Sequence, residues 1–334
     1  MENSSIQNER NYYLDFLKVF GLALIILAHV PIPGWLSMIR NFDVPLMVFI
    51  SGCLANGSFE RSENVFTYFK KRIFRLLIPT WIFLSVYFLL LYIFTNNGLP
   101  GRNTILKSYL LQNDSIGFVW IIRIYLLCAF SVPFLKKIDF SKLYTFGVVV
   151  FVYILYELSC KYRLWMNYRI IECTVYYLIP YGIVLLFGLN WKRFSRKEKR
   201  LLLLFSFLGF TTLQVLYFHK FGEYCFTQKY KYPPRHLFLM HAFLYIFLLM
   251  QFESKLNFLG NNKVIVFISK STLWIYLWHI LVLRLAGKVI SNAHWSLKYV
   301  FVLSISLLLV FVQNKILDII EIKWKIPILK VFRG

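Results

Sequence analysis

Long apolar runs follow one another along nearly the whole chain, and short polar segments separate them. A membrane-spanning helix needs about 20 mostly apolar residues, and ten segments meet or approach that length. The pattern therefore predicts an all-α, polytopic membrane helical bundle with about ten transmembrane helices. The expected spans are 14–31, 36–57, 76–95, 117–135, 143–159, 173–190, 200–218, 236–252, 264–285 and 298–317.

The second span is interrupted by Arg40, Asp43 and Pro45. Charged residues and proline are tolerated at membrane depth where the backbone is buried in protein or lines a cavity. We therefore expect an irregular, cavity-facing segment here instead of a lipid-facing helix.

The first span carries three ionisable residues on one helical face. Lys18 and His29 are eleven residues apart, and Asp15 precedes Lys18 by three. At about 100° per residue this spacing places Lys18 and His29 on one stripe, roughly 16 Å apart along the axis. Ionisable groups inside a bilayer are costly and usually face a bundle interior or a water-filled cavity. The face therefore predicts a functional site, with Asp15 and Lys18 near one membrane surface and His29 much deeper.

Composition supports a membrane protein, because 59% of the residues are hydrophobic and only 16% are charged. The apolar runs leave no room for a separate soluble domain, so we expect one membrane domain over residues 1–334 with a short polar tail at about 1–13. That tail lacks the basic start and the cleavage site of a signal peptide, and the first span should therefore be retained.

The formal net charge of +23 does not indicate a nucleic-acid partner, because the Lys and Arg residues fall in short segments between the apolar runs. Outside the spans, 22 of them lie on the side of the N-terminus and 12 on the opposite side. The positive-inside rule then predicts that both termini are cytoplasmic. Lys18 lies near the cytoplasmic mouth in this topology, and His29 lies toward the outer face.

The sequence offers no pattern for a metal site or for two common hydrolase mechanisms. The five cysteines are scattered without metal-ligand spacing, and neither HExxH nor GxSxG occurs. We therefore expect no metal.

A basic segment at residues 68–79, YFKKRIFRLLIP, precedes the third span and contains Arg72 and Arg75. One interpretation is a topology signal that contacts lipid headgroups. The other is an anion site for a phosphorylated or nucleotide-bearing ligand, since arginine suits phosphate. The sequence leaves both interpretations open.

Five further residues are candidates for binding a substrate. Trp120 lies near the start of the fourth span and is typical of an interfacial anchor, whereas Arg123 lies inside that span and needs a partner. Arg235, with tyrosines just before it, fits either contacts to a sugar or a rigid turn before the eighth span. Tyr276 and His279 share a face of the ninth span, although a lone histidine on an apolar helix more often serves packing than catalysis.

Five stretches along the chain carry a common signal: LDFLKVFGLALIILAH at 14–29, FDVPLMVFISGCL at 42–54, KRIFRLLIP at 71–79, GFVWIIRIYLL at 117–127 and SKSTLWIYLWH at 269–279. Taken together, they resemble the acyltransferase-3 family of integral membrane acyltransferases. Lys18 stands where the family has an arginine and His29 where it has a histidine, so the positive charge is kept but the planar fork is lost. The segment YPPRH at 232–236 is similar to the subgroup related to fucose 4-O-acetylases and to the membrane protein of the intercellular-adhesion polysaccharide system.

The resemblance implies O-acyl transfer, most often of acetyl, from cytoplasmic acyl-CoA to a hydroxyl of an extracytoplasmic glycan or lipid-linked sugar. Acetyl-CoA would then be the donor co-substrate, and the protein would lie among the lipids of a bacterial cytoplasmic membrane. In this scheme Lys18, Arg72 and Arg75 meet the donor, and Asp15 orients Lys18.

For His29, the resemblance implies a general base that accepts the proton of the acceptor hydroxyl, or a side chain that is transiently acylated. Tyr276 and His279 would polarise the thioester or bind the sugar. A different class, an exporter of polysaccharide or lipid-linked sugar, uses intramembrane charges to line a path. The sequence favours the enzyme, because no inverted repeat of broken helices is visible.

Overall fold

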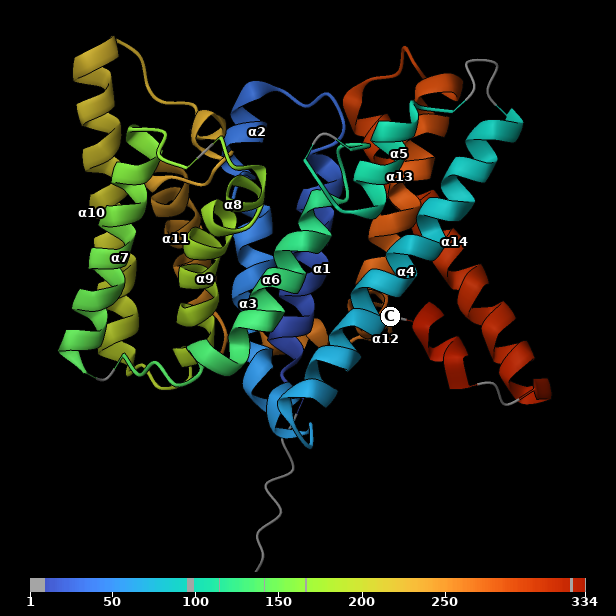
Figure 1. Ribbon diagram of the computed structural model, residues 1–334, viewed down its shortest axis with the longest axis horizontal. Helices are drawn as coiled ribbons and strands as arrows, with labels where there is room; N and C mark the ends of the chain where they lie inside the picture. Colours follow the sequence, from blue (N-terminus) through green and yellow to red (C-terminus); the bar gives the residue numbers. More distant parts are fainter. Residues whose placement is uncertain are drawn as a thin grey trace, which may run out of the picture.

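The computed structural model describes residues 10–94, 99–113, 115–140, 142–165, 167–324 and 327–333, so most of the expected polar tail lies outside the described residues. Within these ranges the chain is helical and contains no strand (Figure 1). Three short 3₁₀ helices occur at Thr227–Tyr230 (η1), Asn257–Gly260 (η2) and Pro327–Phe332 (η3). The α-helices are α1 Tyr12–Leu27, α2 Gly34–Ile39, α3 Asp43–Glu60, α4 Val65–Phe94, α5 Arg102–Tyr109, α6 Trp120–Leu135, α7 Leu143–Lys161, α8 Arg169–Cys173, α9 Val175–Asn190, α10 Arg196–Phe221, α11 His236–Met250, α12 Lys263–Lys270, α13 Thr272–Val289 and α14 Trp295–Trp324.

Each of the ten predicted ranges coincides with helix, but some boundaries differ. The second range is broken, because α2 ends at Ile39 and α3 begins at Asp43, as the charges and the proline there predicted. The basic segment at 68–79 is not separate from the third range, since α4 runs without a break from Val65 to Phe94.

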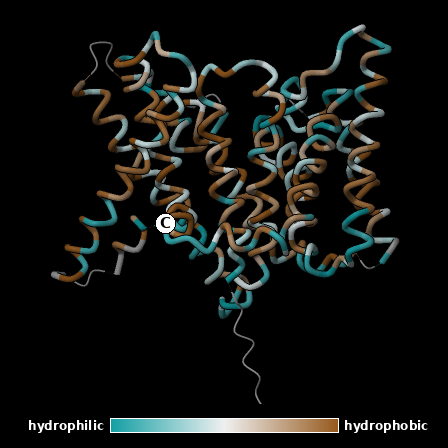
Figure 2. The backbone as a smooth tube through the Cα atoms, turned by 180° about the vertical axis from the view of Figure 1, so that it is seen from behind, coloured by the Kyte–Doolittle hydropathy of each residue, from teal (hydrophilic) through white to brown (hydrophobic). Residues whose placement is uncertain are grey.

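Seven of the described helical segments are long and apolar enough to cross a membrane, and α6 and α11 are shorter apolar helices. In Figure 2, hydrophobic residues occupy the middle of the long helices, and hydrophilic residues gather toward their ends. In Figure 1, α1 begins and α14 ends at the lower side of the bundle. The molecule is thus a multi-pass helical protein, while ten crossings and cytoplasmic termini stay predictions.

Helix α1 lies at the centre of the bundle and packs against α3, α12, α13 and α14. Its first turn is fixed by polar contacts: the Tyr13 hydroxyl donates to the carbonyl oxygen of Leu249 at 2.6 Å, and the Tyr13 amide donates to Asn257 Oδ1 at 2.9 Å. Gly260 lies so close to Tyr12 that a Cβ at this position would overlap the Tyr12 carbonyl. The position of α1 is therefore set by close packing at the end that carries Asp15 and Lys18.

Helices α3 and α9 cross at two glycines. A Cβ on Gly52 would overlap the carbonyl oxygen of Leu185, and one on Gly188 would overlap that of Phe49. Small residues at such crossings let two helix backbones approach closely, and this contact is a main source of helix association in lipid. The crossing holds α3, and with it Asp43 at the start of α3, against the rest of the bundle.

We expect Gly188→Val to destabilise the protein, because the added side chain separates α3 from α9 and overpacking of this kind costs about 1–3 kcal/mol. The unfolding temperature of the purified protein, measured by a fluorescence thermal-shift assay, should fall by several degrees. Gly147→Val in α7 is the matched control, since a Cβ at Gly147 meets no atom within 4 Å. Equal unfolding temperatures for the two variants would contradict the close crossing.

Candidate active site

Two histidines that are far apart in the sequence meet at the end of α1. The helix ends at Leu27, so His29 lies in the turn that follows it and not inside the helix as the sequence predicted. Its Nδ1 atom is 3.3 Å from Nε2 of His279, which lies in the middle of α13 and is fully buried. The packing of α1 against α13 therefore brings together two of the candidates, and Tyr276, one turn before His279, joins them.

The hydrogen bonds around His279 define which nitrogen of each ring carries a proton. His279 Nδ1 bonds to the backbone carbonyl oxygen of Tyr276, and a carbonyl can only accept, so this nitrogen is the donor. In a neutral ring the other nitrogen is then an acceptor. His279 Nε2 consequently accepts from Nδ1–H of His29, which leaves Nε2 of His29 with a free lone pair. Such an imidazole has the lone pair that a general base needs.

The surroundings of the pair are aromatic on one side and open on another. The ring of Phe118 lies with its centroid 4.9 Å from that of His29, and the Tyr276 hydroxyl donates to the Phe118 carbonyl oxygen at 2.6 Å. On the open side, His29 lines a cavity of about 230 Å³ together with residues of α13 and α14. His29 is thus the member of the pair that a small reactant can approach, whereas His279 is enclosed.

A buried ionic cluster, called here the Asp43 cluster, consists of Arg40, Asp43 and Lys231. Asp43 forms an ion pair with Arg40 and lies 3.5 Å from the Lys231 ammonium. All three residues are at most 4% exposed. Burial lowers the pKa of Lys231, which lies in the loop before α11, and the Asp43 carboxylate opposes this effect. The positive charges of Lys231 and Arg40 both act on His29, so the cluster belongs to the same region as the histidine pair.

The sequence carries only a partial signal for the Asp43 cluster. The charges in the second span predicted a cavity-facing segment there, but nothing linked that segment to Lys231, which is 188 positions after Asp43. Asn41 makes a second link to the same loop, because its Nδ2 donates to Thr227 Oγ1 at 3.0 Å. The loop before α11 is therefore part of the site region.

At the other end of α1, Asp15 gathers three partners. Arg10 lies 2.5 Å away, Lys18 lies 3.2 Å away, and the Ser269 hydroxyl of α12 donates to the carboxylate at 2.5 Å. Asp15 is buried, while the side chains of Arg10 and Lys18 remain 35% and 24% exposed. The predicted pairing of Asp15 with Lys18 is present, and Arg10 is an additional cation that the sequence interpretation counted only as a topology signal.

Arg72 and Arg75 add two cations from α4. Arg72 donates to the Ser58 hydroxyl and stacks over the ring of Tyr68, 4.8 Å from its centroid. Arg75 is exposed, and its charge acts on Lys18. With Asp15 as the carboxylate between Arg10 and Lys18, this end of α1 has an excess of positive charge that suits an anion.

Two candidate substrate-binding residues on α6 contact an aromatic ring and a loop. Trp120 meets the ring of Tyr232 edge-on at 5.3 Å between centroids. Arg123 is buried and donates to the carbonyl oxygen of Leu111 at 2.8 Å and to Asn113 Oδ1 at 2.6 Å. The partners of Arg123 thus lie in the segment that precedes α6. These hydrogen bonds hold that segment against the helix.

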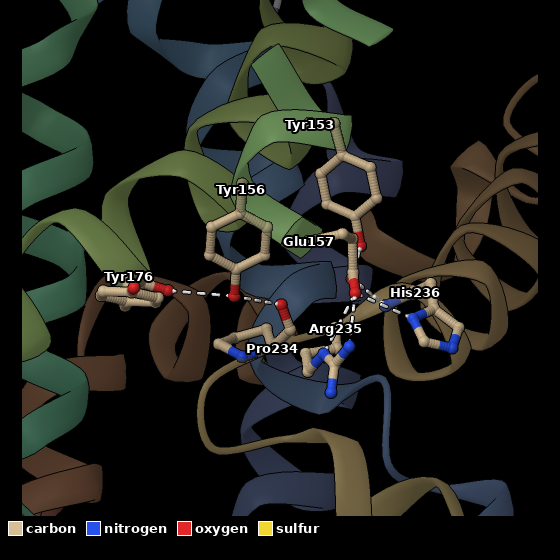
Figure 3. A network of polar contacts seen from close by, with 7 residues as sticks. All are labelled: Tyr153, Tyr156, Glu157, Tyr176, Pro234, Arg235 and His236. Carbon is tan, nitrogen blue, oxygen red and sulfur yellow. Dashed lines mark hydrogen bonds and ion pairs between the residues drawn. The ribbon is translucent and has the colours of Figure 1, made fainter. Parts of the chain in front are cut away.

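Arg235 lies in a polar network that joins α7 to the loop before α11 (Figure 3). Glu157 of α7 accepts from Arg235 Nε at 3.0 Å and from the backbone amide of His236 at 2.7 Å, and its carboxylate lies 3.0 Å from His236 Nδ1. Beside it, the Tyr156 hydroxyl donates to the Pro234 carbonyl at 2.7 Å. Arg235 is therefore engaged in holding the loop, which fits the rigid-turn interpretation, and Glu157 is a network member that the sequence did not single out.

The fold and this region define the class of the protein: a multi-pass helical membrane protein in which the half-buried His29, backed by the buried His279, lies beside a cavity. Among the described residues, no group of three or more His, Cys, Asp or Glu side chains is placed to hold a metal ion.

Comparison with known proteins gives the family. A family model described as an acyltransferase domain matches residues 11–313, so the chain belongs to the acyltransferase-3 family and is a membrane acyltransferase. No curated protein and no solved structure matches the chain with significance. The subgroup related to fucose 4-O-acetylases stays a prediction.

Proposed function

We propose that the protein is an O-acyltransferase whose preferred acyl group is acetyl. It moves this group from cytoplasmic acyl-CoA to a hydroxyl of an extracytoplasmic glycan or lipid-linked sugar. The observation that carries this proposal is the free Nε2 of His29, which lies beside a cavity and is backed by His279. A neutral imidazole oriented by a hydrogen-bonded partner is the usual arrangement of a general base. The membrane of a bacterial cell, with the acceptor on its outer side, is the expected location.

In the proposed reaction His29 Nε2 takes the proton of the acceptor hydroxyl as its oxygen attacks the thioester carbonyl carbon. The carbonyl π electrons move to oxygen, and they return as the carbon–sulfur bond breaks. The leaving thiolate takes the proton from His29 Nε2–H, so that an ester and free CoA are formed and the imidazole is neutral again. A variant of this scheme, in which His29 itself carries the acyl group between donor and acceptor, uses the same nitrogen.

The excess of cationic side chains at the Asp15 end of α1 supports an acyl-CoA donor. CoA carries several phosphate groups, and Arg10, Lys18, Arg72 and Arg75 offer them charged donors at the side where the positive-inside rule expects cytoplasm. The deeper cavity at His29 would receive the acyl group. Donor recognition and proton transfer are thus assigned to opposite ends of the same short helix.

The test is acyl transfer by the purified protein in proteoliposomes, with radiolabelled acetyl-CoA and a glycan extract of the source cells as acceptor. We expect label in the glycan fraction with wild-type protein and none without protein. Succinyl-CoA in a parallel reaction tests whether acetyl is the preferred group. Movement of lipid-linked sugar across the membrane without any labelled product would instead favour the exporter.

For donor binding, we expect Lys18→Ala to raise the KM for acetyl-CoA about tenfold, the effect of losing roughly 1.4 kcal/mol from a charged contact to phosphate. Lys18→Arg should be tolerated better, because it keeps the charge. Initial rates over a range of acetyl-CoA concentrations measure the effect. Lys70→Ala, at an exposed lysine of α4, is the control and should leave the KM unchanged. An unchanged KM in Lys18→Ala would remove Lys18 from the donor site.

A further inference from the structure

The Asp43 cluster carries an unbalanced positive charge in a buried place. Arg40 and Lys231 are cationic and share the single carboxylate of Asp43. A buried charge without a counter-charge is costly, and in a native protein it indicates a functional partner more often than a packing accident. The cluster therefore has capacity for one additional negative charge.

Five buried polar atoms around the cluster have no hydrogen-bond partner within the described part of the chain: Arg40 Nε, Asn41 Oδ1, His241 Nδ1, and the hydroxyls of Tyr125 and Tyr181. Both tyrosines interact electrostatically with Asp43. Buried polar groups are almost always paired, so several unpaired ones that surround one ionic cluster require an explanation. A bound molecule with several hydroxyl groups would satisfy donors and acceptors of this kind.

Two aromatic residues lie beside the cluster. The ring of Tyr232 is 50% exposed and meets Trp120 edge-on. The ammonium of Lys231 lies 5.8 Å from the centroid of the same Tyr232 ring. The exposed Tyr232 ring and the Trp120 ring therefore offer aromatic faces next to Lys231 on which a sugar ring can stack.

We propose that the Asp43 cluster binds the acceptor and that the acceptor is a sugar bearing one negative charge, as a carboxylate or a phosphate ester. The inference rests on the proposed function, because it takes the acceptor hydroxyl to be delivered to His29. The anionic group pairs with Arg40 and Lys231, the sugar hydroxyls meet Tyr125, Tyr181 and Asn41, and a further hydroxyl reaches His29. Asp43 keeps the two cations in place when the acceptor is absent.

The test compares acceptors that share one methyl β-D-glucoside ring and differ in the group at C6. The probes are methyl β-D-glucoside, its uronic acid methyl β-D-glucuronide, and methyl β-D-glucoside 6-phosphate, each with acetyl-CoA and purified protein. We expect kcat/KM to be about tenfold higher for the better anionic probe than for the glucoside, the effect of one charged contact. The larger of the two anionic values identifies carboxylate or phosphate as the natural group.

Lys231→Met should lower the ratio of kcat/KM for the better anionic probe to kcat/KM for the glucoside to about one. The Arg40–Asp43 ion pair stays balanced in this variant and supports the fold. The control Lys229→Met, at an exposed lysine of the same loop that pairs with Glu223, should keep the wild-type preference. A wild-type ratio near one would overturn the inference. It would also be overturned if Lys231→Met lowered transfer to the charged and the neutral probes by the same factor.

A binding measurement separates this inference from the proposed function. The anionic probes should raise the unfolding temperature of the wild-type protein more than the glucoside does, and this difference should vanish in Lys231→Met. Such stabilisation together with no acetyl transfer to any acceptor would overturn the proposed acetyl transfer but support the anion site. Absence of stabilisation by every probe would overturn the anion site itself.

Discussion

Replacing His29 with alanine is expected to reduce acyl transfer by a factor of about 10²–10⁴, the contribution typical of a general base. The variant loses the nitrogen that takes the acceptor proton, while no buried charge is created. The loss should appear in kcat, with little change in the KM for acetyl-CoA, because the proposed donor contacts lie at the other end of α1. Initial rates with radiolabelled acetyl-CoA at saturating acceptor measure this effect.

The matched control is His294→Ala, which removes an exposed histidine from the loop between α13 and α14. It should retain wild-type transfer, and both variants should insert into membranes equally well. Incubation of wild-type protein with labelled acetyl-CoA alone then separates the two roles of His29. Label bound to the protein that His29→Ala does not acquire would establish an acyl-histidine, and an unlabelled protein would favour the general base. Wild-type activity in His29→Ala would exclude both.

The second large effect is expected at His279, which acts through His29 and is a positioning residue. His279→Leu removes the acceptor for Nδ1–H of His29, so that the His29 ring is free to rotate and to change its tautomer. We expect transfer to fall roughly 10- to 100-fold, the range found for residues that orient a functional histidine. The change should again lie in kcat and not in KM.

His279→Gln distinguishes positioning from simple packing. The glutamine carbonyl oxygen can take the place of Nε2 and accept the same hydrogen bond, so this variant should retain clearly more activity than His279→Leu. Leucine is the more conservative replacement for an enclosed, apolar site, and the order of activities would be reversed if His279 served only to fill space. Unfolding temperatures of both variants provide the check on stability.

Local features of the fold could be predicted from the sequence. Each apolar run is long enough to form a helix that satisfies its own backbone hydrogen bonds in lipid, and helices occur in all ten ranges. The break between α2 and α3 follows from Arg40, Asp43 and Pro45, which a lipid-facing helix does not tolerate. The pairing of Asp15 with Lys18 is equally local, since residues three apart are neighbours on a helix.

Other expectations needed contacts that spacing along the chain does not encode. His29 was expected inside the first helix, but the chain turns just before it and points the ring toward α13. Arg235 and Arg123 were candidates for binding substrate, and only the structure shows which protein groups each of them contacts. Glu157 was assigned no role, although its carboxylate holds both Arg235 and His236. A charged residue in a sequence shows that a partner is needed but not which residue supplies it.

By itself, the sequence determined that the chain is helical and membrane-embedded, that its first helix carries ionisable groups, and that it resembles a family of acyltransferases. Only the tertiary structure decided that His279 backs His29 across 250 positions and that Lys231 completes a buried cluster with Arg40 and Asp43. The physical reason is that lipid is as apolar as the helix faces, so hydrophobicity does not select which helices pack together. That choice depends on close contacts such as Gly52 with α9 and on polar pairs buried between helices, which exist only once the bundle has formed.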